Sequence, residues 1–357
     1  MRYLTIEQLL SELEHRPGLV PIDLDSTKRH LVWLDFDTYH FYEGFFHKSL
    51  DRFIAIKKSR PTSSAVVTFV TDLNVLRDPR IITDSIYPNA FIFHAGRCGS
   101  TLLARVLAGN RRHLVISEAP THNQIWLTLV RADSKRPEAT EENKQIYKRL
   151  ILAVGRRRLP EHHLHFIKFT SFNILFFEFI RSVFPDVPAI FLYREPGPIL
   201  DSFVRNPPGW LTSKDEALAK LLDSFLGDKC EPRSEQSTAQ LLIEFFEAGL
   251  RAASAGARLL NYSALNSQNL PAILDALGIP RIGTTNQQLA LMRNQFQFSS
   301  KEDYRLSVFS APSSVERHKR NIAPQLMESL EKVFEELRRC DSNVVRGDRH
   351  TLPANSP

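Results

Sequence analysis

Cysteine is scarce in this chain of 357 residues, which contains only Cys98, Cys230 and Cys340. These three show no CxxC spacing and no histidine cluster beside them, so the sequence indicates neither a disulfide framework nor a zinc site. Long apolar runs are also lacking, because no window approaches the roughly 18 uncharged apolar residues of a membrane-spanning helix. The first residues lack the apolar stretch of a signal peptide. We therefore expect a protein of the reducing cytoplasm that has no membrane partner.

Charge of either sign is present in ordinary amounts. Lys and Arg together number 46 against 40 for Asp and Glu, which gives a net charge of +6 and a pI near 9.2. This excess weakly favours an anionic ligand. The densest basic runs, residues 156–158 and 317–320, are short, and the other basic residues are scattered. We therefore expect no nucleic-acid partner.

The first part of the chain, residues 1–88, is predicted to be an N-terminal extension that contributes to an acceptor site or a lid. Its pattern predicts an amphipathic helix over residues 5–15 and a strand over residues 31–37. Aromatic residues are dense between positions 33 and 46, where they either pack in a core or line an acceptor pocket. At the other end of the chain, residues 346–357 form a polar tail that is expected to be disordered.

From residue 89 onward, short apolar runs alternate with segments of helical periodicity. This alternation is typical of an α/β fold, in which helices cover both faces of a parallel sheet, and we expect one such domain over residues 89–345. The predicted strands are residues 90–93, 114–117, 165–169, 189–193 and 258–262. The predicted helices are residues 100–108 and about 140–157, 172–184, 199–204 and 234–255. Ligands of such sheets bind beyond the carboxyl ends of the strands, so the chemistry is expected there.

A turn of small residues follows the first of these strands, with the sequence Gly96-Arg97-Cys98-Gly99-Ser100-Thr101. Backbone N–H groups at such a turn, helped by the positive end of the next helix, form a concave anion site. A loop for nucleoside triphosphates places Lys directly after its second Gly. This chain has Ser100 at that position and carries its cation earlier, as Arg97. The turn is therefore suited to a different anion.

The run Arg97-Cys98-Gly99-Ser100-Thr101 resembles the phosphosulfate loop of the sulfotransferase family, which reads Lys/Arg-Ser-Gly-Ser/Thr-Thr directly after a strand. It departs from the family only at Cys98, where Ser is usual. The resemblance covers about residues 89–340 and is nearest in pattern to the bacterial, carbohydrate and protein-tyrosine branches. It implies a P-loop fold and the donor 3'-phosphoadenosine 5'-phosphosulfate (PAPS), which leaves as 3'-phosphoadenosine 5'-phosphate (PAP). It also implies that the five residues of the run contact this donor.

Arg194 follows the predicted strand at residues 189–193, and Ser202 lies eight residues later in the next helix. In the family, an Arg and a Ser at this spacing hold the 3'-phosphate of the donor. Arg can grip a phosphate with two parallel hydrogen bonds, and the Ser hydroxyl adds a neutral one. A Walker-type NTPase would need an Asp at the end of such a strand to hold magnesium. The resemblance therefore implies a 3'-phosphate site at Arg194 and Ser202.

Two further segments resemble parts of the family's donor site. Residues 260–265 resemble a Tyr-Glu-Asp-Leu strand whose Tyr packs on the adenine, although Ser263 replaces the usual acidic residue. The basic run at residues 313–320 resembles a segment that closes over the nucleotide. The resemblance thus implies that Tyr262 and Arg317 bind the donor.

Sulfuryl transfer needs cations near the sulfonate, an in-line geometry and a base for the acceptor proton, and it inherently requires no metal. Arg97 supplies one catalytic cation. Lys168 lies within the strand predicted at residues 165–169 and corresponds to the family's Lys that precedes the 3'-phosphate Arg. We therefore expect Arg97 and Lys168 to act on the transferring group without a metal.

Glu118 is the predicted general base. One branch of the family places a His two residues after the Lys, but Thr170 stands there and cannot act as a base near neutral pH. Another branch uses a Glu shortly after the second strand, as Glu118 follows residues 114–117. To act as a base, Glu118 needs a pKa that burial or neighbouring groups adjust. It has the alternative role of capping the next turn, and His94 and His122 are further candidates.

Two other functions remain open. A P-loop kinase or another NTP-dependent phosphotransferase lacks support, because both the loop Lys and the strand-end Asp are missing. A nucleotide-binding protein without catalysis is compatible with the departures at Cys98, Thr170 and Ser263. For the sulfotransferase we expect a small-molecule, sugar or natural-product acceptor, bound by residues 1–88 and about 210–235. The sequence gives no indication of the oligomeric state.

Overall fold

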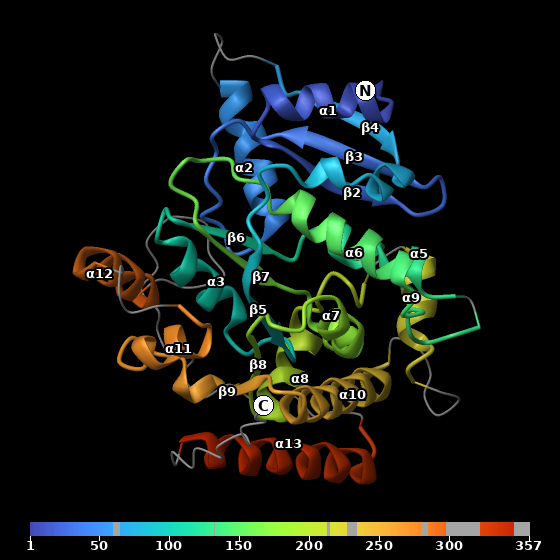
Figure 1. Ribbon diagram of the computed structural model, residues 1–357. Coiled ribbons are helices and arrows are strands. Elements are labelled where there is room, and N and C mark those ends of the chain that lie inside the picture. Colours follow the sequence, from blue (N-terminus) through green and yellow to red (C-terminus); the bar gives the residue numbers. More distant parts are fainter. Residues whose placement is uncertain are drawn as a thin grey trace, which may run out of the picture.

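The computed structural model describes residues 1–59, 65–131, 133–212, 215–226, 234–279, 285–297 and 322–345. Its central element is a five-stranded parallel sheet in the order β6-β7-β5-β8-β9 (Figure 1). The strands are β5 (Pro88–His94), β6 (His113–Ser117), β7 (Leu164–Lys168), β8 (Ala189–Tyr193) and β9 (Arg258–Asn261). The α/β class and the parallel sheet predicted from the sequence are confirmed, with strand ends displaced by no more than two residues.

Helices cover both faces of this sheet. The side chains of each strand alternate between two apolar clusters, one on each face. In β5, Ala90 and Ile92 belong to one cluster, and Phe91 and Phe93 belong to the other. The first cluster includes α3 (Ser100–Ala108), α11 (Leu270–Ala276) and α12 (Asn286–Asn294). The second includes α6 (Glu141–Val154), the 3₁₀ helix η3 (Ser171–Phe176), α7 (Phe177–Val183) and α10 (Glu235–Ser254).

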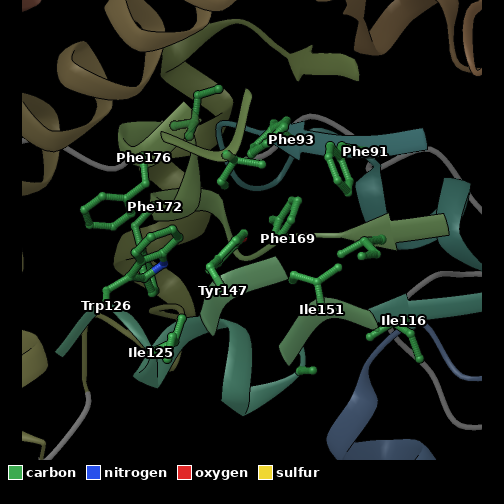
Figure 2. Close-up of a cluster of buried hydrophobic side chains, with 14 of the residues drawn as sticks. Phe91, Phe93, Ile116, Ile125, Trp126, Tyr147, Ile151, Phe169, Phe172 and Phe176 are labelled. Carbon is green, nitrogen blue, oxygen red and sulfur yellow. The ribbon is translucent and has the colours of Figure 1, made fainter. Parts of the chain in front are cut away.

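Aromatic rings fill much of the second cluster, as Figure 2 shows. The rings of Phe93 and Phe169 stack with their centroids 4.9 Å apart. Trp126 stacks on Phe176 with a centroid distance of 4.3 Å, and its ring N–H donates to Oδ1 of Asn173 at 2.6 Å. Such close-packed rings hold the ends of β5 and β7 in fixed positions.

The residues before β5 form a second sheet in the order β1-β4-β3-β2, drawn in blue at the top of Figure 1. Its strands are β1 (Arg2–Tyr3), β2 (Leu19–Asp25), β3 (His30–Asp35) and β4 (Thr68–Asp72). The accompanying helices are α1 (Ile6–His15), α2 (Phe46–Ser59) and the 3₁₀ helices η1 (Leu73–Arg77) and η2 (Pro79–Ile82). The predicted helix at residues 5–15 and the strand at 31–37 are confirmed, the strand ending two residues earlier. The sheet packs on α6 and shares its apolar cluster.

The remaining described helices are α4 (Pro120–Gln124), α5 (Trp126–Leu129), α8 (Pro196–Arg205), α9 (Glu216–Asp223), η5 (Tyr262–Ala264), η6 (Gln295–Gln297) and α13 (Pro324–Val345). In Figure 1, α13 packs along α10 at the end opposite the N-terminal sheet. The helix predicted at residues 199–204 begins earlier because Pro196 suits a first helical position. The helix predicted at 172–184 opens as a 3₁₀ helix.

Two predictions fall outside the part of the chain that the structure describes. These are the donor-closing residue Arg317 and the polar tail at residues 346–357. Among the described helices, none is both long enough and apolar enough to cross a membrane.

Candidate active site

The turn between β5 and α3 has a backbone suited to an anion. Gly96, Arg97 and Gly99 have φ angles of 90°, 52° and 81°. A left-handed φ strains a residue with a side chain but not a glycine. Arg97 is therefore strained in this turn, whereas Gly96 and Gly99 adopt their left-handed φ angles without strain. Ser100 is buried and begins α3, whose first N–H groups have no partner within the helix. The turn and the helix start therefore have the backbone geometry expected of an anion site.

Arg97 contributes a half-buried cation to this turn. Its Nη2 donates to the carbonyl oxygen of Asn206, and its guanidinium carbon lies 5.8 Å from the centre of the Phe203 ring. Its Nε is buried and has no hydrogen-bond partner among the described residues. Burial lowers the pKa of Arg97, and the negative charge of Glu118 opposes that effect. The side chain thus offers an unsatisfied N–H beside the anion site.

Arg194 and Tyr262 come together at the same turn. A Cβ atom at Gly99 would lie 3.1 Å from the Tyr262 ring, so the missing side chain lets this ring approach the loop. The guanidinium carbon of Arg194 lies 4.4 Å from the centre of that ring, and its Nη1 donates to the carbonyl oxygen of Arg97 at 3.4 Å. Arg194 Nε lies 3.8 Å from the Glu195 carboxylate and has no hydrogen-bond partner among the described residues. The structure therefore gathers the three residues that resemble donor ligands.

Ser202 and Cys98 occupy different surroundings. Ser202 lies in α8, beside Phe203, whose ring fills the space where a Cβ at Gly96 would stand. Cys98 is fully buried, its Sγ donates to the carbonyl oxygen of Leu192 at 3.3 Å, and burial raises its pKa to about 12. Cys98 is therefore a packed thiol and not a reactive thiolate.

Lys168 is a fully buried cation at the end of β7. Its Nζ donates to Oε1 of Glu118 and to Oγ1 of Thr101, the latter at 3.4 Å. The ring of Phe45 lies 4.4 Å from Nζ on another side. A buried charge is costly unless it is paired, and Glu118 provides that pairing. The predicted catalytic Lys168 and Glu118 are thus in direct contact and lie beside the loop through Thr101.

Glu118 is positioned by backbone and side-chain contacts. Its N–H donates to the carbonyl oxygen of Lys168 at 2.8 Å, and its φ is 56°, the strained region that Arg97 also occupies. Burial alone would raise its pKa, but the charge of Lys168 and a contact with His94 outweigh burial and leave the pKa at about 2. Of the two influences expected from the sequence, burial and neighbouring groups, the neighbouring groups therefore have the larger effect on this pKa. At the next turn α4 has Ala119 as its N-cap without a side-chain cap, and the Glu118 carboxylate accepts a hydrogen bond from Lys168.

The other candidates for the base differ in their surroundings. His94 lies beside Glu118, with its Nε2 3.6 Å from Oε1. His122 is buried, its ring lies 5.8 Å from that of Phe169, and burial lowers its pKa to about 3. Thr170 is buried and its Oγ1 has no hydrogen-bond partner among the described residues. Only His94 of these three therefore touches the Glu118 and Lys168 pair in the described structure.

The N-terminal extension reaches this site through Gly44 and Phe45, at the end of the aromatic-dense stretch of residues 33–46. The carbonyl oxygen of Gly44 accepts a hydrogen bond from Ser117 Oγ at 2.6 Å, and a Cβ at Gly44 would collide with Thr101. The next residue, Phe45, covers Lys168. The aromatic density of residues 33–46 was the available signal, and it fits both of its interpretations. Phe46 is buried in the core, whereas Phe45 is partly exposed at the site.

The described residues include no cluster of metal ligands, and the two hollows found do not border the turn after β5. Among the described residues, no three His, Cys, Asp or Glu side chains gather as a metal site. Two surface hollows of about 300 and 600 Å³ border α6 and the N-terminal sheet, and neither is lined by a residue of the turn after β5. The candidate site is therefore described by its cations and its backbone geometry.

No protein-family model matches the chain, and no curated protein matches it in sequence. The solved structures that resemble it include three sulfotransferases. One is a sulfotransferase domain from the curacin biosynthetic pathway, 13% identical, covering 71% of this chain and 99% of that one with a TM-score of 0.36. Another is a sulfotransferase from Alicyclobacillus acidocaldarius, 15% identical, covering 73% and 97% with a TM-score of 0.36.

The third is a sulfotransferase from Mycobacterium avium, 12% identical, covering 93% of this chain and 95% of that one with a TM-score of 0.44. The chain is thus similar to three sulfotransferases. Because all three TM-scores lie below 0.5, these similarities by themselves assign no function to it.

Proposed function

We propose that this chain is a sulfotransferase that moves a sulfuryl group from PAPS to an acceptor hydroxyl or amine. The observation that carries the proposal is the meeting of Arg97, Arg194 and Tyr262 at the turn after β5. Two guanidinium groups whose buried Nε atoms make no hydrogen bond among the described residues, together with one aromatic face, suit a donor with two phosphate-like ends and an adenine. A magnesium-dependent kinase would need an acidic residue where Arg194 stands.

In this proposal the donor lies across the turn. The first N–H groups of α3, at Ser100 and Thr101, and the Arg97 side chain bind the 5'-phosphosulfate. Arg194 and Ser202 bind the 3'-phosphate, and Tyr262 packs against the adenine. Cys98 and Gly99 shape the turn. Arg317, outside the described residues, is carried over from the family resemblance as a residue that closes over the nucleotide.

The transfer itself requires one bond to form and one to break. The acceptor oxygen or nitrogen forms a bond to sulfur while the bridging bond to the phosphate breaks, and PAP leaves with the bonding electrons. The acceptor proton goes to Glu118, which is ionised at neutral pH and can accept it. Lys168 and Arg97 balance the charge on the sulfonate and on the leaving group. An anion that draws Lys168 away from Glu118 would make that carboxylate more basic.

The acceptor site is proposed to include the N-terminal extension. Phe45 covers the catalytic Lys168, and Gly44 contacts Ser117 and Thr101, so residues of this extension border the place where the acceptor must attack. An aromatic wall favours the apolar surface of a small molecule, a sugar or another natural product. A screen of candidate acceptors identifies the acceptor.

Turnover of PAPS labelled with radioactive sulfur tests the proposal. Incubation with a panel of phenols, alcohols, amines and sugars should give a labelled product and PAP in equal amounts, and EDTA should not stop it. ATP labelled on its γ-phosphate serves as the competing donor. Magnesium-dependent transfer from ATP, without transfer from PAPS, would return the assignment to a P-loop kinase. Binding of PAP without any turnover would instead support a nucleotide-binding protein.

A further inference from the structure

His94 connects the anion-binding turn to the carboxylate of Glu118. It is the last residue of β5 and is 5% exposed, so its ring is fixed inside the protein. Its Nδ1 accepts a hydrogen bond from the N–H of Gly96 at 3.0 Å. Its Nε2 lies 3.6 Å from Glu118 Oε1 and has no closer hydrogen-bond partner among the described residues. One ring therefore touches both halves of the candidate site.

The hydrogen bond from Gly96 fixes the tautomer of this ring. An N–H donor needs a lone pair, so Nδ1 is unprotonated, and in a neutral imidazole the proton is then on Nε2. Burial lowers the pKa of His94, which keeps the ring neutral near pH 7. With the proton on Nε2 and the Nδ1 lone pair in use, His94 cannot accept the acceptor's proton. The ring is suited to hold two neighbours and not to act as the base.

Each contact of His94 has a distinct consequence. The Gly96 N–H belongs to a glycine with φ of 90°, so the contact helps to hold the turn in its left-handed form. The Nε2–H group points its positive end at Glu118, beside Lys168 on the same carboxylate. Both neighbours lower the pKa of Glu118, and the charge of Arg97 is also felt there. His94 thus acts on the donor loop through one nitrogen and on the base through the other.

We propose that His94 is a positioning residue that couples donor binding to the orientation of Glu118. This inference rests on the proposed function, because it gives the two ends of the ring the roles of donor loop and general base. A donor that moves the turn at Gly96 would shift the ring, and the ring would shift the carboxylate. The coupling requires no contact between His94 and the substrate.

Two substitutions separate the two ends of the ring. His94→Asn places a side-chain oxygen near the Nδ1 position and keeps an acceptor for Gly96, but it loses the donor to Glu118. His94→Gln places an amide N–H near the Nε2 position and keeps the donor to Glu118, but it loses the acceptor for Gly96. Calorimetric titration with PAP reads the donor site. Infrared difference spectra over a pH titration, with Glu118→Gln as the assignment control, read the carboxylate.

Each substitution is expected to change one of the two measurements. His94→Gln should weaken PAP binding by roughly 3- to 10-fold, the effect of one lost hydrogen bond, while the Glu118 carboxylate stays ionised as in the wild type. His94→Asn should bind PAP as the wild type does, but its Glu118 should become protonated at a higher pH, because a group that lowers that pKa is gone. A Glu118 titration in the wild type that is the same with and without PAP, or no effect of either substitution, would overturn the coupling.

Further measurements keep this test separate from that of the proposed function. Nitrogen NMR of histidine-labelled wild-type protein reports the tautomer, even if both variants fail to fold. A proton on Nε2 supports the inference, and a proton on Nδ1 overturns it. A wild-type protein that does not bind PAP contradicts the proposed function, while the tautomer and the Glu118 titration still decide whether His94 holds the carboxylate.

Discussion

The guanidinium carbon of Arg194 lies 4.4 Å from the centre of the Tyr262 ring, although the two residues follow different strands of the sheet. Such a stacked pair orders a cation that would otherwise be mobile, and its Nε remains without a hydrogen-bond partner among the described residues. In the proposed function, this pairing orders an arginine that binds the 3'-phosphate of the donor. A 3'-phosphate site at Arg194 would distinguish PAPS and PAP from ATP and ADP, because ATP and ADP carry no 3'-phosphate.

Replacement of Arg194 should therefore remove the preference for a 3'-phosphate. Arg194→Ala loses a charge-assisted, two-bonded contact, so PAP affinity should fall by about 10²-fold, whereas the affinity for adenosine 5'-phosphosulfate should change little. Isothermal calorimetry with both nucleotides measures the difference. Arg205→Ala, an exposed arginine at the end of α8, is the matched control and should leave both affinities as they are. An equal loss for both nucleotides in Arg194→Ala would assign this arginine to the 5' end.

Glu118→Gln should lower the chemical step by about 10²- to 10⁴-fold, because the amide has nearly the same shape but cannot accept the acceptor's proton. PAP affinity should hardly change, since Glu118 contacts Lys168 and not the donor turn. Single-turnover kinetics with an acceptor from the screen measure the step. Glu161→Gln, which alters an exposed carboxylate paired with Arg111, is the control. Turnover of Glu118→Gln at the wild-type rate would place the base elsewhere.

The ion pair of Glu118 also makes a prediction about stability and pH. Its pKa in the folded protein is about 2, below the ordinary value of 4.5. A carboxyl with a lowered pKa stabilises the fold above its unfolded pKa and loses that contribution as the pH falls toward the folded value. The stability difference between wild type and Glu118→Gln should thus be largest at pH 5–7 and shrink as the pH approaches 3. Urea denaturation across this range measures it, and a pH-independent difference would contradict the pairing.

Arg156 should be the most sensitive of the three consecutive arginines to substitution. It is 3% exposed and donates to the carbonyl oxygens of Leu13, Arg16, Leu19 and Thr83, which ties the end of α1 and the start of β2 to the segment after α6. Arg156→Ala removes four hydrogen bonds of a buried guanidinium and should lower the free energy of unfolding by roughly 2–4 kcal/mol. Urea denaturation measures this loss. Arg131→Ala, which breaks an exposed pair with Asp133, should cost less than about 1 kcal/mol.

The parallel sheet could be predicted because its strands are buried on both faces and are therefore continuous apolar runs. The predicted bounds of α3 equal the observed ones, since Gly99 and Gly109 flank the helix as its two caps. The N-terminal sheet was largely missed, because β1 has two residues and β2 contains Pro21 and a shift of register. Local sequence patterns predict elements better than they predict which short strands pair.

Part of the candidate site lay beyond sequence reasoning for a different reason. Glu118 and Lys168 were each predicted, but their contact joins residues 50 positions apart, and the resulting pKa depends on that contact. Phe45, directly before α2, covers Lys168 at the end of β7, and no motif predicts how these two segments lie relative to each other. His94 was one of several candidate bases, and its role is distinguished by two contacts, the hydrogen bond from Gly96 and the approach of Nε2 to Glu118.

The most direct test of the central claim is the thermal stability of the protein with PAP, ATP or ADP at equal concentrations. PAP should raise the melting temperature well above the value with either other nucleotide, because only PAP offers a 3'-phosphate to Arg194. At about 100 times its dissociation constant, a ligand adds roughly 2.7 kcal/mol to the free energy of unfolding, which is readily measured. Equal shifts with all three nucleotides, or a larger shift with ATP and magnesium, would contradict the assignment of PAPS as the donor.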